Sequence, residues 1–181
     1  MSRIAIPARD AAPAASHSIL DAVNVQLGVV PNLYRLVALS PAALTGMTSL
    51  SGALAKALDV KTRERLAVAT AQANGCDYCL SAHTYLGLNL ASLTPEEIAL
   101  NRQGASTDAK ADAAVRFGKK VAETRGRIEV ADLDAVRAAG FTDAQVIEIV
   151  AVVAQNFLTN LINNVAKTEI DFPVCLTAEA A

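Results

Sequence analysis

One stretch of the chain indicates the fold class: TRERLAVATAQANGCDYCLSAHTYLGLNL, which runs from Thr62 to Leu90. Apolar residues recur at helical spacing in its first half, which predicts a helix over 63–74 with Thr62 as its N-cap. Asn74 and Gly75 both tolerate a left-handed backbone and are expected to end that helix. The rest of the stretch, from residue 77 on, predicts a second helix. The stretch therefore predicts two helices joined by a short turn.

The same helical pattern continues through the chain. Further helices are predicted over 18–27, 33–39, 41–58, a short segment opening at Thr94-Pro95, 107–124, 132–139 and 142–167. No alternating strand pattern is present, so we expect an all-α fold in a single domain of 181 residues. Residues 1–16 are predicted to be a loose N-terminal arm. Residues 169–181 are predicted to be an extended tail that packs on a neighbouring subunit or on its own core.

The composition excludes several classes of protein. The chain is 52 % hydrophobic, with only 4 % aromatic residues, and its formal net charge is −2. A charge so close to zero gives no electrostatic footprint for nucleic acid or for an anionic membrane. There is no uninterrupted apolar run of 18 residues and no apolar core of a signal peptide, so we expect a cytoplasmic protein that does not span a membrane. Three cysteines in such a reducing compartment are not a disulfide framework.

The residues that indicate chemistry are Cys76, Cys79 and His83, with Glu64 on the preceding predicted helix. Steps of three and four place the first three on one helix face, at a helix start that favours a thiolate. The helix dipole favours Cys76 as the nucleophile, because Cys76 lies nearer the terminus. The imidazole of His83, oriented by a carboxylate such as Glu64, favours Cys79 instead.

Other interpretations of these residues predict other chemistry. Two buried structural thiols would need no histidine. Zinc could take two Cys, one His and one Glu as ligands, but a second ligand pair is absent. Haem attachment needs His directly after the second cysteine, where Leu80 stands. We therefore predict no cofactor and no metal. The asparagines between 156 and 164 are interpreted as a polar helix face, and Cys175 as a packing residue of the tail.

The spacing from Glu64 to Cys76, Cys79 and His83, E-x11-C-x2-C-x3-H, resembles the active-site signature of the AhpD-like alkyl hydroperoxidases of the carboxymuconolactone decarboxylase superfamily. Flanking segments resemble its peroxidase-related branch: Val30-Pro31-Asn32-Leu33-Tyr34-Arg35, Ser40-Pro41 and Glu169-Ile170-Asp171-Phe172-Pro173.

The resemblance implies an AhpD-like helical bundle that assembles into homo-trimers or hexamers, and a thiol peroxidase. Cys79 would attack a hydroperoxide and Cys76 would resolve the sulfenic acid into a disulfide. Glu64 and His83 would be the proton relay, and a lipoyl- or thioredoxin-like dithiol would be the electron donor.

One position departs from the family pattern. The best-known members carry a second histidine just before the second cysteine, and this chain has Tyr78 there. A phenol with an ordinary pKa of about 10 does not shuttle protons as imidazole does. A disulfide oxidoreductase without peroxide chemistry, or a metal-binding or redox-sensing module, is therefore the alternative. Decarboxylation, the reaction of the superfamily's namesake, does not require two cysteines at this spacing.

Overall fold

The structure is a computed structural model that describes residues 2–177. These residues form nine α-helices, a short 3-10 helix and no strand, which confirms the all-α prediction. In chain order the helices are α1 (Ala14–Leu27), α2 (Asn32–Val37), α3 (Pro41–Leu54), α4 (Val60–Ala73), α5 (Asp77–Asn89), α6 (Pro95–Gln103), α7 (Ala109–Thr124), α8 (Val130–Ala138) and α9 (Asp143–Ala166).

Three helix starts are capped by short polar side chains. The Ser40 and Thr94 side chains each accept a hydrogen bond from the backbone N–H three residues later, and proline opens the helix that follows. Thr142 forms a reciprocal capping box with Gln145 at the start of α9. Short polar side chains before an apolar run therefore place these starts to within a residue.

The start of α4 differs from the prediction. The helix begins at Val60, because Asp59 and not Thr62 is its cap. The Asp59 carboxylate accepts the Thr62 backbone N–H at 3.0 Å and the Thr62 hydroxyl at 2.6 Å. Both residues are good caps, and the carboxylate takes the position because it satisfies two donors at once.

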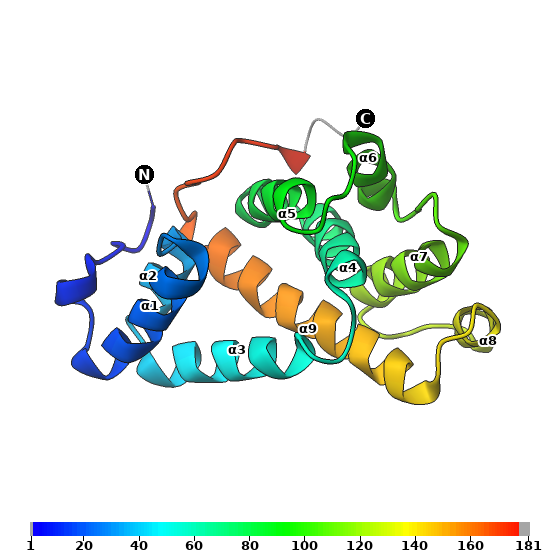
Figure 1. The fold of residues 1–181 in the computed structure, drawn as a ribbon, viewed down its shortest axis with the longest axis horizontal. Helices are drawn as coiled ribbons and strands as arrows, with labels where there is room; N and C mark the ends of the chain where they lie inside the picture. Colours follow the sequence, from blue (N-terminus) through cyan, green and yellow to red (C-terminus); the bar gives the residue numbers. More distant parts are fainter. Residues whose placement is uncertain (1, 178–181) are drawn as a thin grey trace.

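The helices are arranged around α4 and α9. In Figure 1, α1, α2 and α3 gather toward one end of the molecule, α6, α7 and α8 toward the other, and α9 runs diagonally between them. α4 packs against α5, α6, α7 and α9. The helix that carries Glu64 is therefore enclosed by four others, and α5, which carries the two cysteines, lies directly on it.

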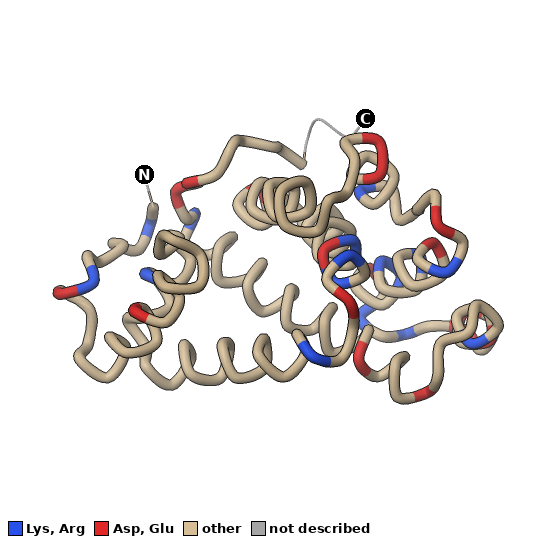
Figure 2. Tube along the Cα trace, in the orientation of Figure 1, with Lys and Arg blue, Asp and Glu red and all other residues tan. Residues whose placement is uncertain are grey.

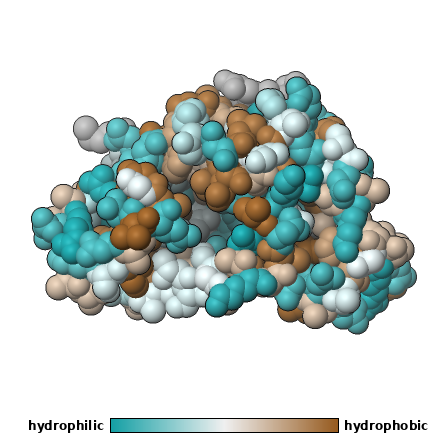
Figure 3. Space-filling view, in the orientation of Figure 1, coloured by the Kyte–Doolittle hydropathy of each residue, from teal (hydrophilic) through white to brown (hydrophobic). Residues whose placement is uncertain are grey.

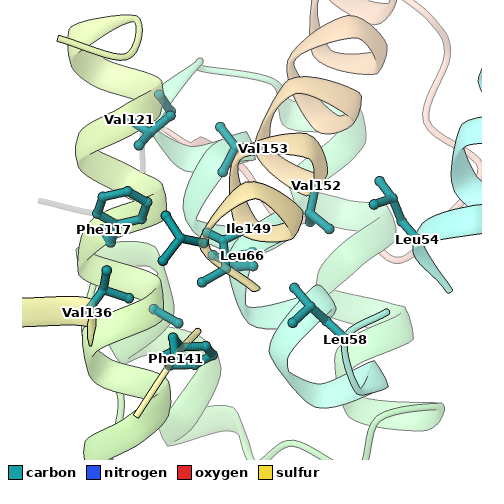
Figure 4. Close-up of a cluster of buried hydrophobic side chains, with 13 residues drawn as sticks. Leu54, Leu58, Leu66, Phe117, Val121, Val136, Phe141, Ile149, Val152 and Val153 are labelled. Atoms are coloured by element: carbon teal, nitrogen blue, oxygen red, sulfur yellow. The ribbon is translucent and has the colours of Figure 1, made fainter. Parts of the chain in front are cut away.

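The largest apolar cluster lies between α4, α7 and α9 (Figure 4). Its central side chains include Leu66 of α4, Phe117 of α7 and Ile149 of α9. Gly118 of α7 faces the same cluster, and a Cβ atom there would overlap the Leu66 side chain. The close approach of α7 to α4 therefore needs a glycine at this position, and it makes a rigid base for the site on α5.

The N-terminal arm is shorter and better anchored than predicted. α1 already begins at Ala14, and Arg9–Ala11 form the 3-10 helix. The Ser16 hydroxyl is fully buried and donates to the Ala38 carbonyl at 2.8 Å. The Arg9 guanidinium holds the Asp21 carboxylate with two bonds of 2.6 Å.

The described part of the tail, residues 169–177, packs on the chain's own core. The Phe172 ring lies edge-on to Tyr78 and tilted against Tyr85, with both centroids 5.9 Å away. The Thr177 backbone N–H donates to the Asp77 carboxylate at 2.9 Å. The tail thus crosses α5, the helix with the cysteines (Figure 1). Residues 178–181 of the predicted tail lie outside the described residues.

Charge is unevenly distributed over the helices. α4, α6, α7 and α8 carry most of it, whereas α3 has no charged residue (Figure 2).

The face drawn in Figure 3 is hollowed near its centre, with apolar side chains beside the hollow. Within residues 2–177, α9 alone is long and apolar enough to cross a membrane, judged by length and composition. A core helix passes the same test, and α9 packs against α3, α4, α5 and α7.

Candidate active site

The turn predicted at Asn74-Gly75 joins α4 to α5. Gly75 has φ of +60°, in the left-handed region where glycine carries no steric cost. The Cys76 backbone N–H then bonds the Ala71 carbonyl at 3.0 Å, which folds the chain back onto the end of α4. The two helices that carry the predicted site residues are therefore held together by a connection of three residues.

Glu64 and His83 meet across these two helices. The His83 Nδ1 atom lies 2.9 Å from Glu64 Oε2, and the two side chains are only 22 % and 13 % exposed. An ionised carboxylate can only accept, so Nδ1 carries the hydrogen and Nε2 is the free base of neutral His83. Burial lowers the pKa of His83, but the charge and hydrogen bond of Glu64 outweigh it and raise that pKa overall. The pairing on which the sequence interpretation depended is present.

Cys76 and Cys79 are both buried and are not bonded to each other, with exposures of 0 % and 3 %. Cys76 is the N-cap of α5 rather than part of its first turn, so the expected single stripe of three helical residues is only partly formed. Its sulfur accepts the Cys79 backbone N–H at 3.3 Å. Cys76 thus occupies the place that Ser or Asp takes at most helix starts.

The surroundings of the two thiols separate their acidities. Burial raises the pKa of Cys79, but hydrogen bonds from Cys76 and Asn163 and the charge of His83 lower it to about 7. The hydrogen bond with Cys79 and burial raise the pKa of Cys76 well above its ordinary range. The sequence left the choice of nucleophile open between dipole and histidine, and the contacts favour Cys79. The described residues show no hydrogen bond between Cys79 and His83, so the histidine acts on the sulfur through its charge.

Three of the asparagines of α9 are buried and one of them contacts Cys79, which corrects the interpretation of the group as a polar helix face rather than part of the site. Asn156, Asn160 and Asn163 are 7 %, 1 % and 2 % exposed. The Asn163 Nδ2 atom donates to the Cys79 sulfur at 3.2 Å. The available signal was their spacing of four and three residues, which places them on one helix face.

Tyr78 is bonded to a neighbouring helix. Its hydroxyl accepts the Leu33 backbone N–H of α2 at 3.0 Å, and burial raises its pKa far above the ordinary value. The phenol therefore stays protonated and ties α5 to α2. This agrees with the expectation that a phenol at this position does not shuttle protons.

Cys175 packs in the tail as predicted. It is half-buried, and the Arg102 Nη1 atom lies 3.6 Å from its sulfur.

Within residues 2–177, no three His, Cys, Asp or Glu side chains come together as metal ligands. The four residues considered for zinc therefore do not converge on one point.

The comparisons with known proteins agree with this geometry. A model of the carboxymuconolactone decarboxylase family matches residues 41–124, from α3 to α7. A solved AhpD-core, peroxidase-related protein from Ralstonia eutropha JMP134 is 28 % identical, with a TM-score of 0.83. The match covers 94 % of this chain and 92 % of that one. The chain is thus similar to the carboxymuconolactone decarboxylase family in the sequence of α3 to α7, and to an AhpD-core structure over nearly its whole length.

Two further structures with this fold are more distant in sequence. A peroxidase-related protein from Silicibacter sp. TM1040 is 24 % identical, with a TM-score of 0.80 over 93 % of this chain and 91 % of its own. The debrominase Bmp8 is 16 % identical, with a TM-score of 0.76 over 94 % and 91 %. No curated protein matches the sequence. The AhpD-like fold thus spans nearly the whole chain, and this chain carries its cysteine pair at the start of α5.

Proposed function

We propose that the chain is a thiol peroxidase that reduces hydroperoxides, with Cys79 as the attacking thiol and Cys76 as the resolving thiol. The observation that carries the proposal is the separation of the two thiols. Cys79 has its pKa lowered to about 7 beside His83, while Cys76 is held protonated one turn away. A thiol with a pKa near the ambient pH combines thiolate fraction with nucleophilicity.

The first half of the cycle uses Cys79 and His83. Nε2 of His83 takes the thiol proton, directly or through one water, and Glu64 holds the resulting charge. The thiolate attacks the terminal peroxide oxygen, so a sulfur–oxygen bond forms as the oxygen–oxygen bond breaks. The leaving alkoxide takes the proton back from His83 and departs as an alcohol. Cys79 has then lost two electrons to the peroxide and is a sulfenic acid.

The second half uses Cys76. Its sulfur attacks that of Cys79, the disulfide forms, and hydroxide leaves with the Cys76 proton as water. A dithiol donor, lipoyl- or thioredoxin-like, then supplies two electrons and two protons and is itself oxidised to a disulfide. The raised pKa of Cys76 supports this order, because Cys76 stays a thiol while Cys79 reacts first.

The test is consumption of hydrogen peroxide and of tert-butyl hydroperoxide with dithiothreitol as the donor. Cys79→Ser is expected to abolish consumption in a folded protein. Cys175→Ser is the matched control, because this cysteine lies in the tail and should leave the rate unchanged. Cys76→Ser is expected to stop at a sulfenic acid that dimedone traps. Undiminished consumption in Cys79→Ser would overturn the proposal.

The same assay separates the alternatives. A small-molecule disulfide and 2,3,4-tribromopyrrole, which was found bound to a cysteine-to-alanine variant of the debrominase, are offered in place of peroxide. Reduction of the disulfide without peroxide consumption would favour the disulfide oxidoreductase instead. Loss of bromide would favour reductive dehalogenation. Peroxide consumption well above both supports the peroxidase.

We also propose a homo-oligomer. Its support is the outer face of α9, where Ile147, Leu161 and Val165 are 68 %, 53 % and 64 % exposed. Exposed apolar side chains along one helix are typical of a surface that a second copy covers. Light scattering of the purified protein tests this, and a monomer at micromolar concentration would contradict it.

A further inference from the structure

Three amides of α9 are buried, and one of them contacts the reactive cysteine. Asn156, Asn160 and Asn163 lie on the face of α9 that is turned inward, whereas the next residue, Asn164, is exposed. Asn163 Nδ2 donates to the Cys79 sulfur at 3.2 Å. Asn156 Nδ2 donates to the Val152 carbonyl of its own helix at 2.9 Å. Among the three, Asn163 is therefore the amide that contacts the reactive sulfur.

Packing alone does not explain why asparagine stands at these positions, because buried amide atoms without partners destabilise the fold. Asn160 Nδ2 and Asn163 Oδ1 are buried atoms that have no hydrogen-bond partner within the described residues. An unsatisfied buried amide destabilises a fold, and leucine would fill the same space with apolar contacts. Within the described residues, Asn160 Oδ1 accepts from the Asn74 side chain at 2.8 Å, in the turn that leads to Cys76. Asn163, by contrast, is placed so that its Nδ2 group reaches the Cys79 sulfur.

Tyr78, which directly precedes Cys79, makes its hydrogen bond elsewhere, because its hydroxyl is bound to the Leu33 backbone. Besides the Cys76 thiol at the start of α5, the donor to the Cys79 sulfur comes from α9.

We propose that Asn163 is a positioning residue that holds Cys79 as a thiolate, and that the unpartnered Nδ2 group of Asn160, on the same face of α9, is a second donor beside it. N–H groups fixed toward a sulfur stabilise its ionised form more than its neutral form, because a hydrogen bond to an ion is the stronger one. The proposal rests on Cys79 being the reactive thiol of the proposed peroxidase, but it concerns only how that thiol is ionised.

The experiment is the pH profile of alkylation of Cys79 by iodoacetamide, followed by peptide mass spectrometry. Asn163→Leu keeps the volume and removes the donor. Its alkylation midpoint is expected to move up by about one pH unit, which is tenfold less thiolate below the midpoint. Asn163→Asp keeps the shape and replaces the donor by a group that repels a thiolate, so it is expected to move the midpoint further. Asn164→Leu, on the exposed side of α9, is the matched control and should leave the profile unchanged.

The outcomes separate this proposal from the peroxidase proposal, because alkylation needs no peroxide. A shifted midpoint in a protein that consumes no peroxide supports the asparagines and rejects the peroxidase. An unshifted midpoint in folded Asn163→Leu rejects the asparagines and leaves the peroxidase standing. Should Asn163→Leu fail to fold by circular dichroism, Asn163→Asp decides, and a wild-type profile in that variant overturns the proposal.

Discussion

Replacing Glu64 by Gln keeps the shape of the side chain and removes the charge that faces His83. The two side chains form a hydrogen bond of 2.9 Å in a site where both are mostly shielded from water. At pH 5.5, below the ordinary pKa of histidine, His83 is charged, and its hydrogen bond with Glu64 is worth about 2 kcal/mol. At pH 9 less of the imidazole is charged, and a hydrogen bond without that charge is worth about half as much. Glu64→Gln is therefore expected to cost about 2 kcal/mol of unfolding free energy at pH 5.5 and about 1 kcal/mol at pH 9.

The sign follows from linkage. Glu64 raises the pKa of His83 in the folded protein above the ordinary value of about 6.5. The stability that comes from this shift is fully present below the ordinary pKa. It is lost as the pH rises through the raised pKa of the folded state. The difference between wild type and Glu64→Gln must therefore shrink as the pH rises.

The assay is urea unfolding followed by helical circular dichroism at both pH values, with the histidine pKa read by proton NMR. The chain has only two histidines, so His17→Gln assigns the two signals. The NMR titration should show a lower His83 pKa in Glu64→Gln. Equal losses of stability at both pH values, or a larger loss at pH 9, would refute an ion pair between these residues.

Three further predictions follow from the packing and the charges. Iodoacetamide should label Cys79 with a midpoint of about pH 7 and leave Cys76 unlabelled in that range, as mass spectrometry of the digested protein would show. Equal labelling would contradict the difference in pKa between the two thiols. Burial raises the pKa of Glu97, but hydrogen bonds from a serine and a threonine lower it to about 2. The stability that the ionised Glu97 contributes is therefore present above the ordinary pKa of about 4.3 and is lost as the pH falls through about 2. Glu97→Gln should cost about 3 kcal/mol in urea unfolding at pH 7 and less at pH 3, and a larger loss at pH 3 would be inconsistent with this. Gly118→Ala should lower the free energy of unfolding by about 1–3 kcal/mol, because its Cβ overlaps a leucine of α4. Gly52→Ala, in open space on α3, should instead raise the melting temperature. Melting temperatures in the opposite order would show that α7 can shift.

The helices were predictable because their signals are local. A cap such as Thr94 followed by proline, and an apolar stripe such as that of α9, need no knowledge of the rest of the chain. The start of α4 was not predictable, because Asp59 and Thr62 are both good caps, and only the three-dimensional contacts show which side chain accepts the capping hydrogen bond. The arm was predicted as loose because Ala and Pro carry no pattern, yet Ser16 finds a buried carbonyl from another helix.

The site was predictable as far as spacing extends. The positions of Cys76, Cys79 and His83 come from one helix and its cap, and Glu64 from the neighbouring one. Asn163 was missed because it lies 84 residues after Cys79 and because asparagine late in a helix is ordinarily exposed. Its exposed neighbour Asn164 has the same residue type, so composition alone could not separate the two. Only the rotation of α9 against α5 decides which amide meets the sulfur.

The cap formed by Cys76 bears on the redox balance of the pair. In the dithiol state its sulfur accepts the Cys79 N–H, and an N-cap bond is worth about 1 kcal/mol. We expect disulfide formation to draw that sulfur away from the N–H, so that this stabilisation belongs to the reduced protein. For a two-electron couple, 1 kcal/mol corresponds to about 20 mV toward a more oxidising potential. The N-cap bond at the start of α5 therefore stabilises the dithiol state slightly, and this makes reduction of the disulfide by the electron donor more favourable.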